Sequence, residues 1–278
     1  MAGRLSIFAG TGALVPHIVE AALSGGYKVQ VLTLAPRDAI PGIKMINVDL
    51  DNPLGIIWSL KVFRTTQIAM AGGIHLPDKA REGLIRFANG NVDTGNVVAE
   101  APVGDAALGA LAKVLKNMTG ADMIGVHELS PDLLAGEGVI AGAGFDDHAA
   151  ALFALETARA IGMLDIGQAA VTSGRRIIAV EDIGGTDALI ERVGALRARG
   201  LAGNGSTPLI LAKAMQPQQA GFVDLPAVGP RTVTGCAAAG IAAIAVEAGH
   251  SLVLERAALQ AAAKQHGVVV LGMTLDHG

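Results

Sequence analysis

Short apolar runs alternate with longer segments in which apolar residues recur every three or four positions, through the first 130 residues or so. The short runs predict buried strands, and the longer segments predict helices. We expect strands at 5–9, 27–34, 44–48, 67–71 and 123–126, and helices at 15–24, 54–64 and 105–116. Strands that alternate with helices in this way are typical of a parallel sheet with right-handed crossovers. The first part of the chain is therefore predicted to be a Rossmann-like α/β domain.

A glycine-rich segment, 130–144, shows no clear period and is interpreted as a connector. A second set of strands and helices follows it. We expect strands at 169–172, 176–180, 209–213, 242–246, 251–254 and 268–273, and helices at 149–161, 187–199, 232–239 and 257–266. Ser173-Gly174 lies between the first two of these strands, which is a hairpin signal. The sequence therefore predicts two α/β domains, 1–135 and 145–278, with a ligand cleft between them.

Composition narrows the classes of function. The 278 residues are 51% hydrophobic and only 3% aromatic, which suits close packing of helices on parallel sheets. A net charge of −4 without a long basic run argues against nucleic acid as a partner. The single cysteine, Cys236, fits a reducing compartment and a small buried side chain. No run approaches the roughly 18 apolar residues of a membrane span, so we expect a cytoplasmic protein. Peripheral contact with the inner membrane and a homodimer both stay open.

Glycine-rich loops follow two strands of the first domain. Gly10-Thr11-Gly12 lies between a strand and a helix, which is the context of phosphate and nucleotide contacts. The dinucleotide fingerprint fails, because Val15 replaces its third glycine and the second strand ends without an acid, so NAD binding is not expected. A mononucleotide or sugar-phosphate contact and a plain tight turn are both compatible with this loop. Gly72-Gly73 follows the fourth strand at the same edge of the sheet, with His75 close behind.

The chemistry-bearing residues of the second domain also follow strands. Gly184-Gly185 leaves the backbone amides accessible, and Thr186 or Asp187 is expected to cap the helix that follows. This combination suits a phosphate-binding loop as well as an ordinary capped loop. Lys213 ends a strand, where it would hold a phosphate or be solvated. Asp224 precedes a helix that opens at Pro230, so its carboxylate either binds a metal or caps a turn. No zinc motif surrounds His127-Glu128 or any other histidine.

In their order and spacing, these stretches resemble the LpxI-type UDP-2,3-diacylglucosamine pyrophosphatases of lipid A synthesis. The resemblance extends over nearly the whole chain and is strongest in the second domain. The motifs that carry it are Leu164-Asp165-Ile166-Gly167-Gln168, Ala179-Val180-Glu181, Gly185-Thr186-Asp187-Ala188-Leu189, Val223-Asp224-Leu225-Pro226, Gly229, Glu247-Ala248-Gly249 and Val270-Leu271-Gly272. They are specific together, although none is specific alone.

The resemblance implies that water attacks the diphosphate of UDP-2,3-diacylglucosamine, giving UMP and 2,3-diacylglucosamine 1-phosphate. It implies Mg²⁺ or another divalent cation, and a lipid-linked nucleotide sugar as the partner. Asp224 matches the family's essential aspartate and is expected to act as the catalytic residue and as a metal ligand. The residues expected to hold the substrate are Gly10, Thr11, Gly12, Gly72, Gly73, Gly185, Thr186, Lys213 and Gln219.

Several basic residues of the family pattern are replaced in this chain. Leu76, Gln216 and Phe222 stand where the family has arginine or lysine. Near the helix of the first domain, Gly104-Asp105-Ala106 replaces the family's Gly-Asp-Asp. The alternative function is therefore a diverged relative, without catalysis or with another substrate, that binds a nucleotide-sugar or another metabolite between the domains.

Overall fold

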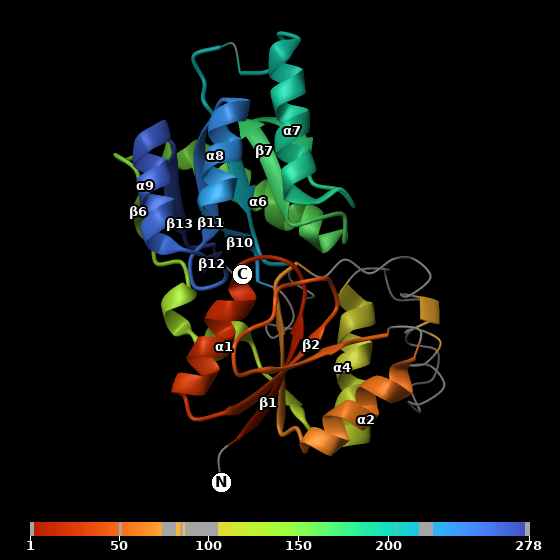
Figure 1. The fold of residues 1–278 in the computed structure, drawn as a ribbon. Coiled ribbons are helices and arrows are strands. Elements are labelled where there is room, and N and C mark those ends of the chain that lie inside the picture. The colour runs from red at the N-terminus through yellow and green to blue at the C-terminus, as the bar shows by residue number, and fades with distance from the viewer. Residues whose placement is uncertain are drawn as a thin grey trace. The chain divides into compact units, whose positions relative to one another are not determined.

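The computed structural model describes residues 3–49, 52–73, 82–83, 86, 105–203, 205–216 and 225–275, with the backbone alone described in 105–111. These residues form two compact units, of which the first ends at Pro131 and the second begins at Asp132. Each unit is an α/β assembly built around its own main sheet, and Figure 1 colours both in chain order.

The sheet of the first unit is fully parallel, in the order β3-β2-β1-β4-β5, which confirms the predicted Rossmann-like sheet. Its strands are β1 (Arg4–Ala9), β2 (Lys28–Thr33), β3 (Lys44–Asn47), β4 (Gln67–Ala71) and β5 (Asp122–Met123). Its helices are α1 (Leu14–Ser24), α2 (Pro53–Phe63), α4 (Asp105–Thr119) and α5 (Val126–Leu129), and the 3₁₀ turn η1 (Pro131–Leu133) leads into the second unit. After their first residues, the strands β1 and β2 are buried throughout, as expected for a parallel sheet that is covered on both faces.

Helix α2 has clear signals at both ends. Pro53 opens it, where the missing amide leaves no donor unpaired, and the Asn52 side chain accepts a hydrogen bond from the Gly55 amide at 3.2 Å. The helix ends at Arg64, which takes the left-handed conformation with a φ of 56°. The side chains of Ile56, Ile57 and Leu60 are buried and anchor one face of the helix in the unit's core.

One strand prediction in the first unit is wrong in part. Residues 123–126 were expected to form a strand, but β5 covers only Asp122–Met123 and Val126 begins the short helix α5. The Glu128 carboxylate accepts a hydrogen bond from the Gly125 amide at 2.7 Å, which stabilises the first turn of that helix. His127 and Glu128 therefore belong to a helix and do not lie at a strand end.

The second unit holds a mixed six-stranded sheet, in the order β6-β13-β11-β9-β7-β8. Strands β9, β11 and β13 are parallel, while β6, β7 and β8 pair antiparallel. The strands are β6 (Gly138–Ala141), β7 (Ala169–Ser173), β8 (Arg176–Val180), β9 (Leu209–Lys213), β11 (Ile241–Glu247) and β13 (Val269–Met273), and β10 (Ala227–Val228) pairs with β12 (Leu252–Val253) in a small second sheet. The helices are α6 (His148–Met163), α7 (Gly185–Ala198), α8 (Pro230–Ala239) and α9 (Arg256–His266). The predicted hairpin of β7 and β8 is confirmed.

The segment 130–144 is more than the expected connector. It contains η1 and strand β6, which pairs antiparallel with β13 and forms one edge of the six-stranded sheet. Strand β6 has only four residues, and two of them are exposed, so its sequence shows little apolar alternation. Its pairing with β13, more than 100 residues later, makes this segment a strand.

Helices cover both faces of the six-stranded sheet. One core joins the sheet to α7, α8 and α9 and includes Leu189, Cys236 and Leu259. The other joins it to α6, whose buried face consists mainly of alanine and therefore approaches the strands closely. Burial raises the pKa of the Cys236 thiol to about 12, so the thiol stays protonated and acts as a small core side chain. Among the described helices, none has the length and apolarity to cross a bilayer.

Candidate functional site

In the first unit, the loops after β1 and β4 bond directly to each other. The Gly10 amide donates to the Ala71 carbonyl oxygen at 2.9 Å, and the Thr11 and Gly73 backbones exchange hydrogen bonds of 3.0 and 3.1 Å. A Cβ atom on Gly10 would lie 2.2 Å from the Gly73 carbonyl oxygen, and one on Gly72 would lie 2.2 Å from the Thr11 carbonyl oxygen. Gly10 and Gly72 are therefore required by the close approach of the two loops, apart from any contact with a ligand.

Gly12 differs from these two glycines. Its φ is 96°, and a Cβ atom there would meet nothing within 4 Å. Helix α1 begins two residues later, and its N-cap residue Ala13 offers no side-chain acceptor. The backbone at Gly12 is thus open on a side where a ligand can approach amides at a helix start.

Arg37 is a functional candidate that sequence reasoning missed. Its Nη2 atom donates to the carbonyl oxygens of Gly10 at 3.0 Å and Gly12 at 3.1 Å. Burial lowers the pKa of the guanidinium, and the neighbouring Asp38 opposes that shift. The loop therefore carries a positive charge from the segment after β2. The sequence signal that could have identified Arg37 was a single arginine shortly after the second strand.

In the second unit, the residue that directly follows β8 is Glu181, whose carboxylate is buried. Glu181 is 6% exposed, and its Oε2 atom accepts a hydrogen bond from the Gln168 amide at 3.2 Å. The Thr186 hydroxyl donates to Glu181 Oε1 at 3.1 Å. Glu181 therefore joins the segment before β7 to the first turn of α7 and fixes the Thr186 hydroxyl.

The capping expected at the start of α7 is wrong. The helix begins at Gly185, its N-cap is Gly184, and no side chain caps it. The Thr186 hydroxyl turns to Glu181, and the Asp187 carboxylate pairs with Arg231 at 3.2 Å. Among the described side chains, none accepts a hydrogen bond from the amides of the first turn of α7.

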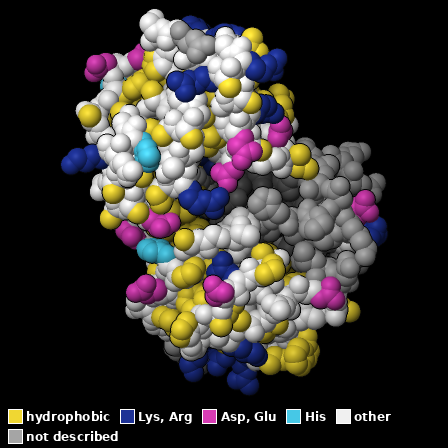
Figure 2. All heavy atoms as spheres, turned by 45° about the horizontal axis from the view of Figure 1, so that its top comes forward, with side chains coloured by type: hydrophobic (Ala, Val, Ile, Leu, Met, Phe, Trp, Pro, Cys, Tyr) yellow, Lys and Arg dark blue, Asp and Glu magenta, His cyan; other side chains and the backbone are white. Residues whose placement is uncertain are grey.

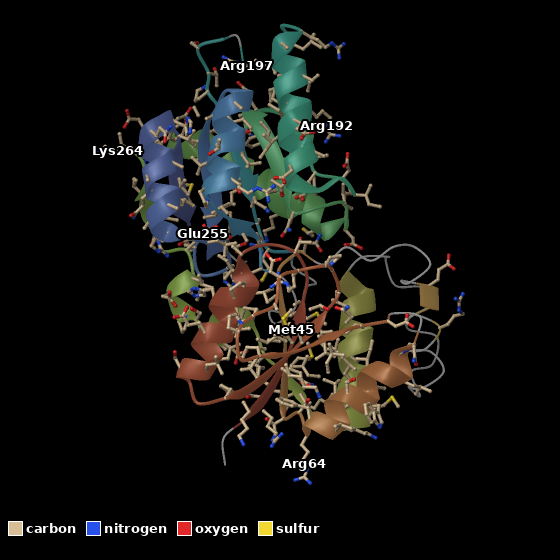
Figure 3. All side chains as sticks on the ribbon, viewed as in Figure 1. Met45, Arg64, Arg192, Arg197, Glu255 and Lys264 are labelled. Atoms are coloured by element: carbon tan, nitrogen blue, oxygen red, sulfur yellow. The ribbon has the colours of Figure 1, made fainter. Side chains whose placement is uncertain are left out.

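Asp182 and Arg192 hold the outer side of the same loop. The Asp182 Oδ1 atom accepts from the Gly184 amide at 2.9 Å, and Arg192, which projects from α7 in Figure 3, pairs with Asp182 Oδ2 at 2.7 Å. These two contacts lower the pKa of the Asp182 carboxyl, the Gly184 amide having the larger effect. Arg192 also donates to the Val180 carbonyl oxygen at the end of β8.

Lys213 lies at the carboxyl end of β9, near the same edge. It is only 5% exposed, and within the described residues its Nζ atom donates to the Ala227 carbonyl oxygen at 3.3 Å and forms no ion pair. Ala169 of β7 is opposite Lys213 in the sheet and accepts the Glu181 amide at 2.8 Å through its carbonyl oxygen. The sheet therefore brings Lys213 and the Glu181–Thr186 pair to one edge.

Glu247 is a second buried carboxylate at this edge. It ends β11, is 2% exposed, and its Oε2 atom accepts a hydrogen bond from the Met215 amide at 3.1 Å. Because Val246 lies opposite Lys213, Glu247 fastens the chain just after β9 to the end of β11. The path of residues 214–216 is thereby held beside Lys213.

Three of the residues singled out from the sequence, Asp224, Gln219 and His75, lie outside the described residues, as do Leu76 and Phe222. Across the described part of the chain, no three His, Cys, Asp or Glu side chains gather in a way that would hold a metal ion. The described residues by themselves therefore do not form the divalent-cation site expected from the resemblance.

Comparisons with known proteins cover the chain from end to end. The LpxI N-terminal domain matches residues 4–133, and the LpxI C-terminal domain matches residues 137–271. The UDP-2,3-diacylglucosamine pyrophosphatase LpxI of Caulobacter vibrioides is 33% identical over 280 aligned positions, which cover 97% of each protein.

Similarity to solved structures is weaker. The Bordetella bronchiseptica enzyme WbmG aligns with a TM-score of 0.28 and 16% identity, over 41% of this chain and 49% of that one. The Thermus thermophilus UDP-glucose 4-epimerase aligns with a TM-score of 0.33 and 15% identity, over 98% of this chain and 86% of that one. The family assignment therefore rests on the two domain matches and on the Caulobacter relative. Because these matches span almost the whole chain, the protein belongs to the LpxI family.

Proposed function

We propose that this protein hydrolyses the diphosphate of UDP-2,3-diacylglucosamine, with UMP and 2,3-diacylglucosamine 1-phosphate as products. One water molecule is consumed as one P–O bond of the diphosphate breaks. The Caulobacter relative, a UDP-2,3-diacylglucosamine pyrophosphatase that aligns over 97% of both chains, supports this substrate. Family membership alone supports the coarser statement that the chain is a diphosphate hydrolase of lipid A synthesis.

The observation that carries the proposal is the setting of Lys213. An ammonium group has three donors, and only one is used by the described residues, on a neutral carbonyl oxygen. Among the described residues Lys213 forms no ion pair, and a buried ammonium group is stabilised when an anion binds directly to it. A phosphate group supplies that charge and accepts the remaining donors. The uncapped first turn of α7 offers further amide donors at the same edge.

Thr186 has a narrower role than the sequence suggests. Its proton goes to Glu181, so its oxygen offers lone pairs outward and accepts hydrogen bonds instead of donating them. In this state Thr186 suits a hydroxyl group of the sugar or nucleotide. A contact with a phosphate oxygen requires the Thr186 hydroxyl to rotate away from Glu181.

Asp224 and a divalent cation complete the proposal. A carboxylate at this position would bind the cation or orient the attacking water, and a bound Mg²⁺ supplies charge for the leaving phosphate. Asp224 is the residue that would hold the cation. One set of assays therefore tests the role of Asp224 and the need for the cation.

The test is release of UMP from purified UDP-2,3-diacylglucosamine, measured with Mg²⁺ and again after removal of metal by EDTA. We expect turnover with Mg²⁺, at least a hundredfold loss in Asp224→Ala, and full activity in the control Glu156→Ala, an exposed acid on α6. EDTA should stop the reaction and added Mg²⁺ should restore it. No UMP release by the folded intact protein would contradict hydrolysis.

A second candidate is favoured by Gln216, which stands where the family has lysine and lies on the segment just after Lys213. One charge-assisted phosphate contact is thereby lost, which would weaken phosphate binding by about 1.5–3 kcal/mol. A relative that binds a nucleotide-sugar without hydrolysis, or acts on another substrate, would show a thermal shift with UDP-sugars while UMP release stays absent.

A further inference from the structure

The outer face of α2 exposes three large apolar side chains at successive turns. Leu54 is 63% exposed, Trp58 is 68% exposed and Val62 is 52% exposed. These three residues, here named the α2 stripe, lie at positions i, i+4 and i+8 and therefore share one face of the helix. The opposite face is already buried in the core of the unit. A helix that is apolar on both faces is normally covered on both.

Four basic residues lie where α2 ends. Lys61 is in the last turn and Arg64 is the C-cap. Arg4 donates from Nη1 to the Phe63 carbonyl oxygen at 2.7 Å, and Lys28 lies opposite Arg4 on the neighbouring strand. Arg4, Lys28, Lys61 and Arg64, here named the basic edge, therefore gather at the amino end of the parallel strands.

Lys28, Lys61 and Arg64 of the basic edge are exposed. Arg64 points away from the unit in Figure 3. Figure 2 shows Lys and Arg side chains gathered at the lower rim of the first unit, beside an apolar cluster. Asp122, an acid at the same edge of the sheet, pairs with Lys116 at 2.6 Å. No residue of the basic edge forms an ion pair with any acid among the described residues, so the edge keeps its positive charge.

We propose that the α2 stripe and the basic edge dock this protein on an anionic bilayer surface. Basic side chains beside a bilayer are attracted to anionic head groups, and their apolar stems remain in contact with the protein. Tryptophan prefers the boundary between head groups and acyl chains, and an apolar helix face lying in that boundary is buried by lipid. The combination on α2 therefore matches a membrane interface in both charge and polarity.

A second copy of the chain fits this surface less well. Helix α2 has 11 residues and is about 16 Å long, so a stripe of three side chains falls short of the roughly 800 Å² that each partner buries in a stable complex. In a symmetric dimer the same patch meets itself, which would place one basic edge against another. Repulsion between these charges opposes that arrangement, whereas an anionic bilayer neutralises them.

The chain supplies its own probe, because Trp58 is its single tryptophan. The experiment adds phosphatidylglycerol vesicles, or phosphatidylcholine vesicles as the neutral comparison, to the intact protein and records tryptophan emission. We expect a blue shift and quenching by brominated lipid with phosphatidylglycerol, a much weaker effect with phosphatidylcholine, and loss of binding at 1 M salt, where charges are screened beyond about 3 Å. Co-sedimentation with the vesicles measures the affinity.

Variants separate the two parts of the surface. Leu54→Gln with Val62→Gln keeps the probe and should weaken vesicle binding at least tenfold. Lys28→Gln with Lys61→Gln should weaken it about 25-fold, because each basic residue near an anionic surface contributes about fivefold. The matched control removes two positive charges elsewhere, Lys264→Gln on α9 (labelled in Figure 3) with Arg199→Gln at the end of α7, and should bind like the parent.

Three results would overturn the proposal. The first is unchanged Trp58 emission with anionic vesicles. The second is that Trp58 is already shielded from acrylamide without vesicles while the mass of the protein rises with its concentration. This result would indicate that a second copy of the chain covers the α2 stripe. The third is that Trp58 is shielded from acrylamide without vesicles in a protein that stays monomeric. This result would indicate that another segment of the same chain covers the α2 stripe. The vesicle measurements do not use the substrate, so failed docking and failed hydrolysis are told apart. In a separate assay, the docking variants should release UMP from detergent-dispersed substrate like the parent.

Discussion

Glu181 shows how one buried side chain organises the edge that carries the proposed chemistry. Its two oxygens accept from the Gln168 amide and the Thr186 hydroxyl, and no described cation compensates its charge. The buried Glu181 carboxylate holds the Gln168 amide and the Thr186 hydroxyl firmly in place, because hydrogen bonds to charged groups are about twice as strong as neutral ones. Glu181 therefore acts as a positioning residue for Thr186 and does not itself need to touch the substrate.

We predict that Glu181→Gln lowers kcat/KM for UMP release by about tenfold, because the neutral amide keeps one acceptor oxygen, so one of the two hydrogen bonds is lost and the other is no longer charge-assisted. The loss should appear in kcat more than in KM, since the variant misorients a group and leaves Lys213 in place. Steady-state kinetics measure it, with Glu191→Gln, an exposed acid on α7, as the control that should behave like the parent. A lowered melting temperature with unchanged kcat/KM would assign Glu181 a purely structural role.

At the scale of elements, the two glycine loops of the first unit form one structural device. The loop after β1 and the loop after β4 are joined by reciprocal backbone bonds between Thr11 and Gly73. Each loop has a glycine where a side chain would collide with the carbonyl oxygen of the other. The pair therefore sets the path of the chain at the carboxyl edge of the sheet, and Arg37 braces it from the segment after β2.

Gly10→Ala should destabilise the protein by at least about 2 kcal/mol, because the new methyl group would lie 2.2 Å from the Gly73 carbonyl oxygen. Urea unfolding followed by circular dichroism measures the change in the free energy of unfolding. The control is Gly136→Ala, where a Cβ atom meets nothing within 4 Å, and it should stay within about 0.5 kcal/mol of the parent. Equal stability of the two variants would contradict the close loop contact.

At the scale of the whole molecule, the chain holds separate hydrophobic cores. Leu60 is fully buried in a core made only of first-unit residues, and Leu155 is fully buried in a core made only of second-unit residues. Units that bury their own apolar residues are able to unfold in separate steps. The fold thus predicts two resolvable transitions rather than one.

Calorimetry should therefore show that Leu60→Ala and Leu155→Ala each lower one transition and leave the other in place. Each substitution should destabilise its own unit by about 2–5 kcal/mol, the usual effect of removing a buried leucine side chain. The two variants serve as each other's controls, because they delete the same atoms from different units. If both variants shift a single common transition, the units unfold as one.

Local pattern predicted most of the elements because their signals lie within a few residues. Strand β4 was expected at its observed bounds, and Pro230 was expected to open a helix and does so. The two errors have different physical causes. Strand β6 depends on a partner more than 100 residues away, and the turn of α5 depends on the Glu128 carboxylate reaching the Gly125 amide. Neither contact leaves a periodic mark on the sequence.

The candidate site was predictable only in part. The sequence predicted glycine loops and strand-end residues at the carboxyl ends of strands, which are a general position for ligands. The roles of Glu181 and Arg37 were missed, because an acid or an arginine after a strand is common and only burial and partners distinguish it. Likewise, Lys213 was compatible with a solvated side chain until its 5% exposure was known.

The sequence by itself determined the α/β class, the Rossmann-like first unit and, through motifs in family order, membership of the LpxI family. These features are encoded locally, by apolar periodicity and by short runs of residues. Only the tertiary structure decided that Gly10 and Gly72 serve loop packing, that the Thr186 hydroxyl donates to Glu181, and that Lys213 is buried with one donor used by the described residues. Each depends on groups brought together from distant positions or on exposure to solvent, which the order of residues does not record.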